Sequence, residues 1–241
     1  MPTVWGEPIA MITVTPIITI AMTDGIMSTK QPLLTALQWL SPAFPIGSFA
    51  YSHGLEWAIE AGHIKDEPTL QSWLQDLIAL GSGRSDAILV SLAHCAEDCA
   101  ALKSLNDLAL ALAPSSERRA ETVLQGQAFC QTLKDVWDYD ISGLCYPVAV
   151  GVGARRGGLE RADITAAYLH AFVANLISAA VRLVPLGQTQ GQRVLLGLMP
   201  DILEVGTDAL SASEKDLTSA CFLSDIAAMR HETLNTRIFK T

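Results

Sequence analysis

The segment from Ser41 to Gly62 restricts the fold more than any other stretch of the chain. It reads Ser-Pro-Ala-Phe-Pro-Ile-Gly-Ser-Phe-Ala-Tyr-Ser-His-Gly-Leu-Glu-Trp-Ala-Ile-Glu-Ala-Gly. Pro42 and Pro45 fix their own φ angles and disfavour helical geometry in the residue before each, which predicts a stiff turn. We expect a helix to follow from about Phe49 to Ala61, with a serine N-cap and a glycine at its end.

Gly54 falls inside this predicted helix, where glycine costs roughly 1 kcal/mol relative to alanine. Its presence indicates that another segment packs close to the backbone there. On the same helix, His53, Glu56 and Glu60 share one face because they are spaced by three and then four residues. Two interpretations remain open: a solvated face with an i,i+3 pair, or half of a transient divalent metal site.

Helical periodicity continues through almost all of the chain after Met27. The expected helices span about 33–40 (opened by Pro32), 66–80, 87–100, 102–112, 116–137, 147–155, 160–184, 192–198, 200–205 and 215–232. No alternation typical of strands occurs after the first 26 residues. The sequence therefore predicts an all-α protein, a single irregular bundle of about ten helices.

The segment from Glu160 to Val184 is the most apolar of these helices, and we expect it at the centre of the bundle. Its polar residues nevertheless fall in one arc of the helical wheel. They are Arg161, Thr165, Tyr168, Asn175, Ser178 and Arg182. The arc is consistent either with a thin solvent face or with the wall of an internal polar channel or interface.

Composition excludes some classes of protein. Half of the 241 residues are hydrophobic and only 17% are charged, which favours a large core or a substantial protein interface. A net charge of -9 argues against a nucleic-acid partner, because phosphate binding needs clustered basic residues. Five irregularly spaced cysteines indicate reduced thiols in a cytoplasmic protein rather than a disulfide framework.

The first 26 residues differ from the rest of the chain. Residues 9–22 are apolar but shorter than the roughly 20 residues that span a bilayer, and no basic region precedes them. We therefore predict that residues 1–26 are a dispensable extension without a membrane role. Residues 27–241 are expected to form one domain.

Motifs for catalysis or nucleotide binding are not found in the sequence. Gly151-Val-Gly-Ala-Arg-Arg lacks both the preceding strand and the final glycine of a dinucleotide fingerprint. His94, Cys95 and Cys99 lack the spacing of a zinc site and are interpreted as helix packing. Nothing identifies a nucleophile, so the residues alone indicate an acidic helical interaction protein and no enzyme.

Three motifs in order resemble the urease accessory protein F family. Residues 40–57 are similar to its N-terminal signature, with Ser48-Phe-Ala in place of the more usual Gly-aromatic-Ser. Asn175 through Gln192 resemble its central motif, which includes Arg182-Leu-Val-Pro-Leu-Gly-Gln188. His231-Glu232 followed by Arg237-Ile-Phe239 resembles its C-terminal motif.

The resemblance implies an all-helical, homodimeric and cytoplasmic chaperone for nickel insertion into urease. Such proteins bridge a nickel-carrying accessory GTPase, called G, and accessory protein D (also called H) in a complex with apo-urease. No cofactor is expected to be bound stably; Ni(II) would make only transient contact, and GTP would be bound by the partner GTPase. A helical adaptor unrelated to nickel and a metal-storing protein are the alternatives.

The matching motif positions are the expected partner contacts. They are Tyr51, Ser52, Gly54, Glu56, Asn175, Arg182, Gln188, Gln192, His231, Glu232, Arg237 and Phe239. The metal-ligand candidates are His53, Glu56 and His231. We expect the tail, residues 233–241, to be loose in the isolated protein and to order against accessory protein D, with Phe239 as its aromatic anchor.

Overall fold

The computed structural model describes the chain from residue 24 to residue 241, and its side chains from residue 31. This part of the chain contains α-helices and two short 3-10 helices but no strand, which confirms the all-α prediction. The helices are α1 (Asp24–Trp39), η1 (Ser48–Ala50), α2 (Leu55–Glu60), α3 (Glu67–Leu80), α4 (Ser82–Cys95), α5 (Cys99–Ala111), α6 (Ser116–Trp137), α7 (Tyr146–Arg156), α8 (Arg161–Leu183), α9 (Gln188–Gly197), α10 (Met199–Asp208), η2 (Glu214–Asp216) and α11 (Phe222–His231).

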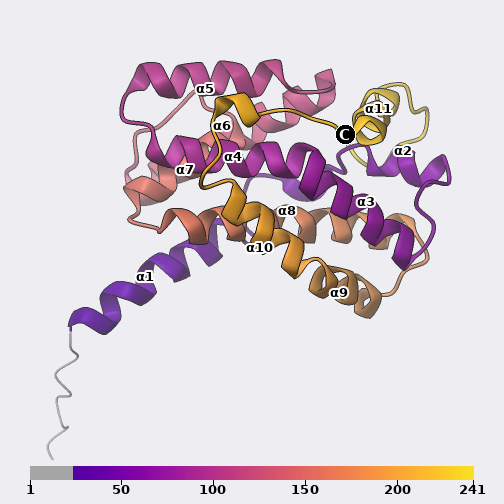
Figure 1. Ribbon diagram of the computed structural model, residues 1–241, viewed down its shortest axis with the longest axis horizontal. Helices are drawn as coiled ribbons and strands as arrows, with labels where there is room; N and C mark the ends of the chain where they lie inside the picture. Colours follow the sequence, from indigo (N-terminus) through magenta and orange to yellow (C-terminus); the bar gives the residue numbers. More distant parts are fainter. Residues whose placement is uncertain (1–23) are drawn as a thin grey trace, which may run out of the picture.

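The core lies where α4, α6, α7 and α8 meet (Figure 1). Helix α7 is the most completely buried, because every residue from Pro147 to Ala154 is buried. Helix α4 packs directly on α7 at Gly151, where an added Cβ would lie 2.4 Å from the carbonyl oxygen of Val90. This small residue therefore allows the two backbones to approach closely.

Helix α8 contacts α2, α3, α4, α7, α9 and α10, so it connects more of the bundle than any other described helix. The predicted central helix is confirmed, although α7 shares that place. Among the described residues, α8 alone is long and apolar enough to cross a bilayer. More than half of its apolar window, 56%, is buried inside the fold, as in an ordinary core helix.

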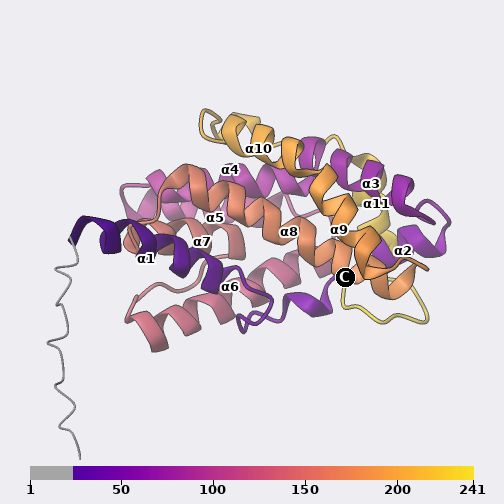
Figure 2. The same ribbon diagram turned by 90° about the horizontal axis from the view of Figure 1, so that it is seen from below.

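The two ends of the molecule differ. Helix α1 runs along one side of the bundle and projects beyond it, as Figure 2 shows. Helices α2 and α11 pack together at the other end, close to the C-terminus. This end carries the motifs of the N-terminal and C-terminal parts of the chain.

Several predicted boundaries are confirmed by local chemistry. The side chain of Asp66 accepts a hydrogen bond from the backbone of Thr69 at 3.1 Å and caps α3. Ser115 caps α6 in the same way by accepting from the amide of Arg118 at 3.1 Å. Two boundaries differ from the prediction. Asp98 caps α5 earlier by accepting from the amide of Ala101 at 2.8 Å, and α4 ends at Cys95 because the backbone of Ala96 is extended.

Other helix predictions were wrong. The helix expected at 87–100 lies earlier, at Ser82–Cys95. The first helix begins at Asp24, with Pro32 inside it instead of at its first turn. The expected long helix 215–232 is divided into η2 and α11. Interactions with other segments account for the break, because the amide of Ala220 donates to the carbonyl of Leu80 at 2.9 Å and Arg84 donates to the carbonyl of Asp216.

The prediction that residues 1–26 are a dispensable extension falls almost wholly outside the described residues. Only the last three of those residues are described, and they form the first turn of α1.

Candidate functional site

The turn after η1 differs from its prediction in a way that shapes the site. His53 and Gly54 both have left-handed backbones, with φ of 56° and 76°, and α2 begins only at Leu55. Gly54 therefore precedes the helix and does not lie within it. The predicted close approach is confirmed, because an added Cβ on Gly54 would lie 2.5 Å from the amide nitrogen of Ala228 on α11.

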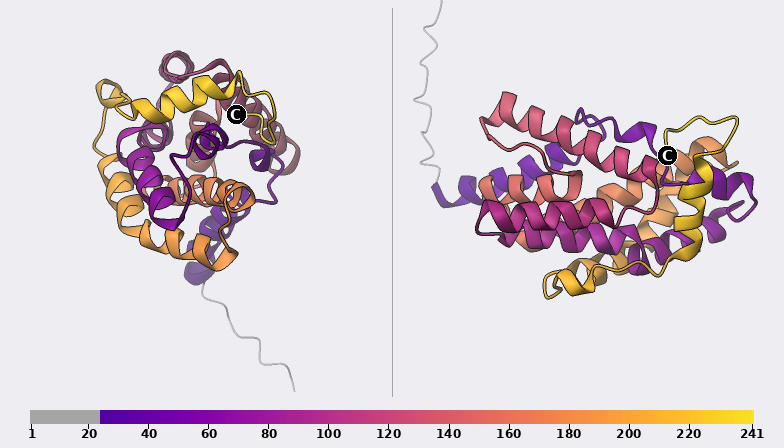
Figure 3. Two further views of the ribbon diagram at one scale, coloured as in Figure 1. Left: turned by 90° about the vertical axis from the view of Figure 1, so that its right-hand side faces the viewer. Right: turned by 90° about the horizontal axis from the view of Figure 1, so that it is seen from above.

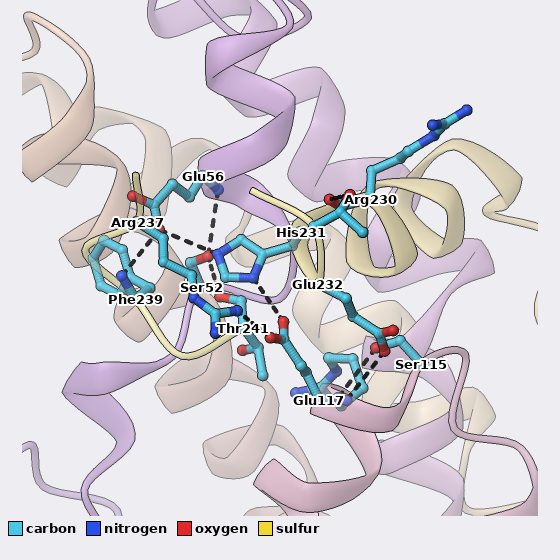
Figure 4. A network of polar contacts seen from close by, with 12 residues as sticks. Ser52, Glu56, Ser115, Glu117, Arg230, His231, Glu232, Arg237, Phe239 and Thr241 are labelled. Carbon is cyan, nitrogen blue, oxygen red and sulfur yellow. Dashed lines mark hydrogen bonds and ion pairs between the residues drawn. The ribbon is translucent and has the colours of Figure 1, made fainter. Parts of the chain in front are cut away.

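Glu56 is the centre of the contacts that join α2 to the end of the chain (Figure 4). One carboxylate oxygen accepts the amide of Ile238 at 2.7 Å, and the other accepts the amide of Phe239 at 2.9 Å. The second oxygen also lies 3.2 Å from Nε2 of His231. This buried carboxylate thus holds both α11 and the tail.

A second carboxylate binds the opposite side of His231. Glu117, in the first turn of α6, lies 2.7 Å from Nδ1 of the ring and also accepts from Arg237. Glu232 accepts from the amide and hydroxyl of Ser116, each at 2.7 Å. The Ser116 hydroxyl, followed by the backbone amides at the start of α6, lowers the pKa of Glu232.

The tail differs from the expectation that it is loose. Phe239 and Thr241 are only 3% and 2% exposed. The amide of Lys240 donates to the carbonyl of Ala50 at 2.8 Å, and the amide of Ser52 donates to the carbonyl of Thr241 at 2.8 Å. Phe239 is consequently buried in its own chain and is not available as an exposed anchor.

Residues of the central motif fix the same region from α8. Asn175 Nδ2 donates to the carbonyl of Ser48 at 3.1 Å, and Arg182 donates to the carbonyl of Phe49 at 3.0 Å. The Arg182 guanidinium also lies 4.5 Å from the centre of the Phe239 ring. The three motifs, far apart in the sequence, therefore meet at one place.

The polar arc of α8 is neither wholly exposed nor wholly buried. Thr165 and Tyr168 are buried, Asn175 is half-buried, and Ser178 and Arg182 are exposed. The remaining motif positions lie in or near the same region. Tyr51 is buried, with a pKa raised by burial and then by Glu121, and Lys240 lies 6.0 Å above its ring.

Gln188 and Gln192 do not join these contacts through any hydrogen bond of their side chains. Gln188 is the first residue of α9, and Gln192 lines a cavity between α8 and α9. The turn before α9 is instead closed by Gln190, which accepts from the amide of Gly187 at 2.8 Å.

A buried ion pair lies below the tail and was missed by the sequence analysis. Glu121 on α6 pairs with Arg118, one turn earlier, and lies 2.8 Å from Nε2 of His53. The hydroxyl of Thr241 donates to the same carboxylate at 2.8 Å. A signal existed, because Arg118 and Glu121 are three residues apart on one helical face.

The charges of this cluster control its protonation. Burial alone would raise the pKa of Glu121, but Arg118 and then His53 outweigh it and lower the value to about 2. Burial, followed by the charge of Arg118, lowers the pKa of His53. At neutral pH the cluster therefore holds an ionised carboxylate, a guanidinium and a neutral imidazole.

The cluster opens onto a large cavity of about 1490 Å³ between α1, α6, α8 and α9. Asp86 lines the same cavity, where it accepts a hydrogen bond from Tyr168 at 2.8 Å. Burial raises the pKa of Asp86 to about 6, against the opposing effect of Arg118. The cavity wall thus combines apolar helix faces with a few charged groups.

The predicted metal face is not assembled. His53 pairs with Glu121, Glu56 binds His231 and the tail, and Glu60 is exposed to solvent. Among the described side chains, from residue 31 to residue 241, no group of three or more His, Cys, Asp or Glu is placed to hold a metal ion. The interpretation of His53, Glu56 and Glu60 as one face was wrong because His53 lies outside the helix.

Comparisons with known proteins agree with the motifs. The model of the UreF family matches residues 64–199. A urease accessory protein UreF of Ruegeria pomeroyi is 50% identical over 213 residues, covering 88% of this chain and 98% of the relative. One from Roseobacter denitrificans is 48% identical over 221 residues, covering 91% and 98%.

The similarity to these relatives extends over 98% of the length of each. The motif resemblance, the helical fold and the matched regions agree with one another. The chain therefore belongs to the UreF family of urease accessory proteins.

Proposed function

We propose that this protein is a nickel-insertion chaperone that bridges the accessory GTPase G and accessory protein D/H on apo-urease. It acts in the cytoplasm as an adaptor and modulates the GTPase without catalysing a reaction itself. GTP is bound by the partner, and Ni(II) makes only transient contact with this chain.

Two separate apolar surfaces carry the proposal. The α11 surface consists of Phe222, Leu223, Ile226, Met229 and the neighbouring Ile238. The α1 surface consists of Leu33, Leu37, Phe49 and Leu196, all of which line the large cavity. Figure 3 (left) shows α11 and α1 on opposite sides of the bundle.

Exposed clusters of large apolar side chains usually mark protein interfaces. Two such surfaces facing different directions allow one chain to hold two partners at once. We assign the α11 surface to accessory protein D/H and the α1 surface to a second copy of this chain. The GTPase would then bind across the dimer.

Transient contact with Ni(II) would occur along the wall of the cavity. Asp86, Glu121 and His53 each supply a donor atom of a kind that divalent metals accept, but the three are not placed to hold one ion together. Arg118 lies among them, and its charge favours brief contact over stable binding.

The decisive experiment deletes this chain from a urease-producing host and restores it. Urease activity and urease nickel content should both fall on deletion and return with the wild-type chain, while the amount of urease protein stays constant. Co-purification should recover accessory proteins D/H and G with this chain. Unchanged nickel content in the deletion strain would overturn the proposal.

The same measurements distinguish the proposed function from an adaptor role unrelated to nickel. That adaptor role predicts partners other than D/H and G and normal nickel content. A metal-storing role predicts tightly bound, stoichiometric metal in the isolated protein, which mass spectrometry under native conditions would detect.

A further inference from the structure

The last five residues of the chain occupy a groove in the manner of a bound peptide. Side chains alternate between exposed and buried along this stretch, with Ile238 70% exposed, Phe239 3%, Lys240 exposed and Thr241 2%. The chain bends at Ile238 and Phe239, so that both amides face one carboxylate. Peptides are commonly recognised through main-chain hydrogen bonds and pockets for individual side chains.

The main chain of this segment is bound by groups from distant parts of the fold. Glu56 accepts two consecutive amides, those of Ile238 and Phe239. The carbonyl of Ala50 accepts the next amide, and the amide and hydroxyl of Ser52 both donate to the carbonyl of Thr241. Main-chain groups of each residue from 238 to 241 are therefore bound by hydrogen bonds to the groove.

Side-chain contacts add selectivity. The Phe239 ring lies beneath the Arg182 guanidinium, at 4.5 Å, which suits an aromatic residue. The Thr241 hydroxyl donates to Glu121 at 2.8 Å, which requires a hydroxyl-bearing residue. Arg237 pairs with Glu117 and Lys240 lies over Tyr51, so the groove also favours basic residues.

The connection to α11 is weak by comparison. Asn235 and Thr236 are exposed, and their side chains make no hydrogen bond to the rest of the described chain. The end of the chain is therefore attached to the fold by its own recognition contacts and by a short exposed connector (Figure 4).

We infer that this groove, formed by Ala50–Glu56, Glu117, Glu121 and Arg182, is a peptide-recognition site whose resident ligand is the chain's own tail. Its ligand class is a peptide with the pattern basic–apolar–aromatic–basic–hydroxyl that bends at the apolar and aromatic residues. The tail binds reversibly and can be replaced by the same sequence supplied in trans. The inference does not depend on the proposed role in urease maturation.

Competition with the tethered tail determines how the site must be tested. A short flexible connector gives the tail an effective concentration of the order of millimolar. A free peptide therefore competes poorly against the wild-type chain. It should bind well only when the resident tail has been weakened.

The experiment uses the full-length protein and a fluorescently labelled peptide of residues 233–241, with binding followed by polarisation. Two protein variants weaken the resident tail: Phe239→Ala, and the double substitution Arg237→Glu with Lys240→Glu. The second variant changes two exposed side chains and removes the pairing of Arg237 with Glu117 and the contact of Lys240 with Tyr51. Circular dichroism verifies the helical content of both.

We expect each variant to bind the wild-type peptide at least tenfold more tightly than the wild-type protein does. Peptides carrying Phe239→Ala or Thr241→Val should lose at least tenfold in affinity, and a scrambled peptide should not bind. Equal binding to wild-type protein and variants, or no binding to correctly folded variants, would overturn the inference. None of these outcomes involves urease, D/H or the GTPase, so the proposed function is tested independently.

Discussion

Two constraints act together at Gly54. Its backbone is left-handed, with φ of 76°, and the backbone of α11 approaches so closely that a Cβ would overlap it. Gly62 has nearly the same φ of 78°, but nothing lies within 4 Å of the place its Cβ would take. A comparison of alanine substitutions at Gly54 and Gly62 therefore distinguishes the free-energy cost of a left-handed backbone from the cost of steric crowding.

We predict that Gly62→Ala lowers the free energy of unfolding by about 1–2 kcal/mol, the cost of a left-handed non-glycine residue. Gly54→Ala should cost roughly 2–5 kcal/mol, because overpacking adds about 1–3 kcal/mol. Denaturant unfolding of both variants measures the difference. Equal losses would show that α11 can move away from Gly54 without cost.

Glu121 makes the stability of the protein depend on pH. Its pKa is about 2 in the folded protein, below the ordinary value of 4.5. The carboxylate therefore contributes stability above pH 4.5 that is lost as the pH falls toward 2. A shift of this size corresponds to about 3 kcal/mol.

We predict that Glu121→Gln destabilises the protein by about 3–5 kcal/mol at pH 7, because Arg118 is left buried without its partner. The loss of stability between pH 4.5 and pH 2 should also become shallower in this variant. Chemical unfolding across this pH range tests both effects. Glu60→Gln, at an exposed carboxylate, is the control and should behave as wild type.

At the scale of elements, helix boundaries that depend on local chemistry could be predicted from the sequence. Helices 66–80 and 116–137 begin at caps that the sequence displays, Asp66 and Ser115. The break between η2 and α11 could not be predicted, because bonds to Leu80 and Arg84 cause it and local propensity does not reveal them. The left-handed turn at Gly54 likewise depends on the approach of α11.

The site was predicted in part for the same reason. Motif resemblance identified Glu56, His231 and Phe239 without indicating that they contact one another or that the tail is buried. Arg118 and Glu121 were overlooked because the start of α6 carries several charges, and the sequence does not show which of them face inward. Only the packing of α6 against the turn at His53 distinguishes them.

Helix α11 is bound on one side by Glu56 and Glu117 and is apolar on its other side. We predict that Ile226→Asp reduces binding to accessory protein D/H at least tenfold, because a charge at the centre of an apolar interface must be desolvated. The side chain is 45% exposed, so the isolated chain should remain folded. Binding is measured by calorimetry or pull-down with purified partner.

Val136→Asp is the matched control for this variant. Val136 is 63% exposed at the end of α6 and belongs to neither apolar surface, so this change should leave binding unaltered. If both aspartate variants bound D/H as well as wild type does, the α11 surface would not be the docking face.

Across the molecule as a whole, α1 is the only described α-helix that makes no extensive contact with any other single element. Its leucines 33, 34 and 37 are all exposed, although Ala36 and Trp39 on the same helix are buried. A helix with one face in the core and a second apolar face in solvent is suited to a symmetric interface. In a two-fold dimer both subunits contribute the same patch, so a single substitution changes two sites in the interface.

We predict that Leu37→Asp converts the proposed homodimer into a monomer at micromolar concentration. Burying a leucine contributes about 2 kcal/mol, and loss of two such contacts weakens a symmetric dimer roughly 1000-fold. Sedimentation velocity over a dilution series measures the change, with Val136→Asp again as the control. A wild-type chain that is monomeric throughout the series would remove the dimer from the proposal. An intact dimer in Leu37→Asp would instead move the interface to another face.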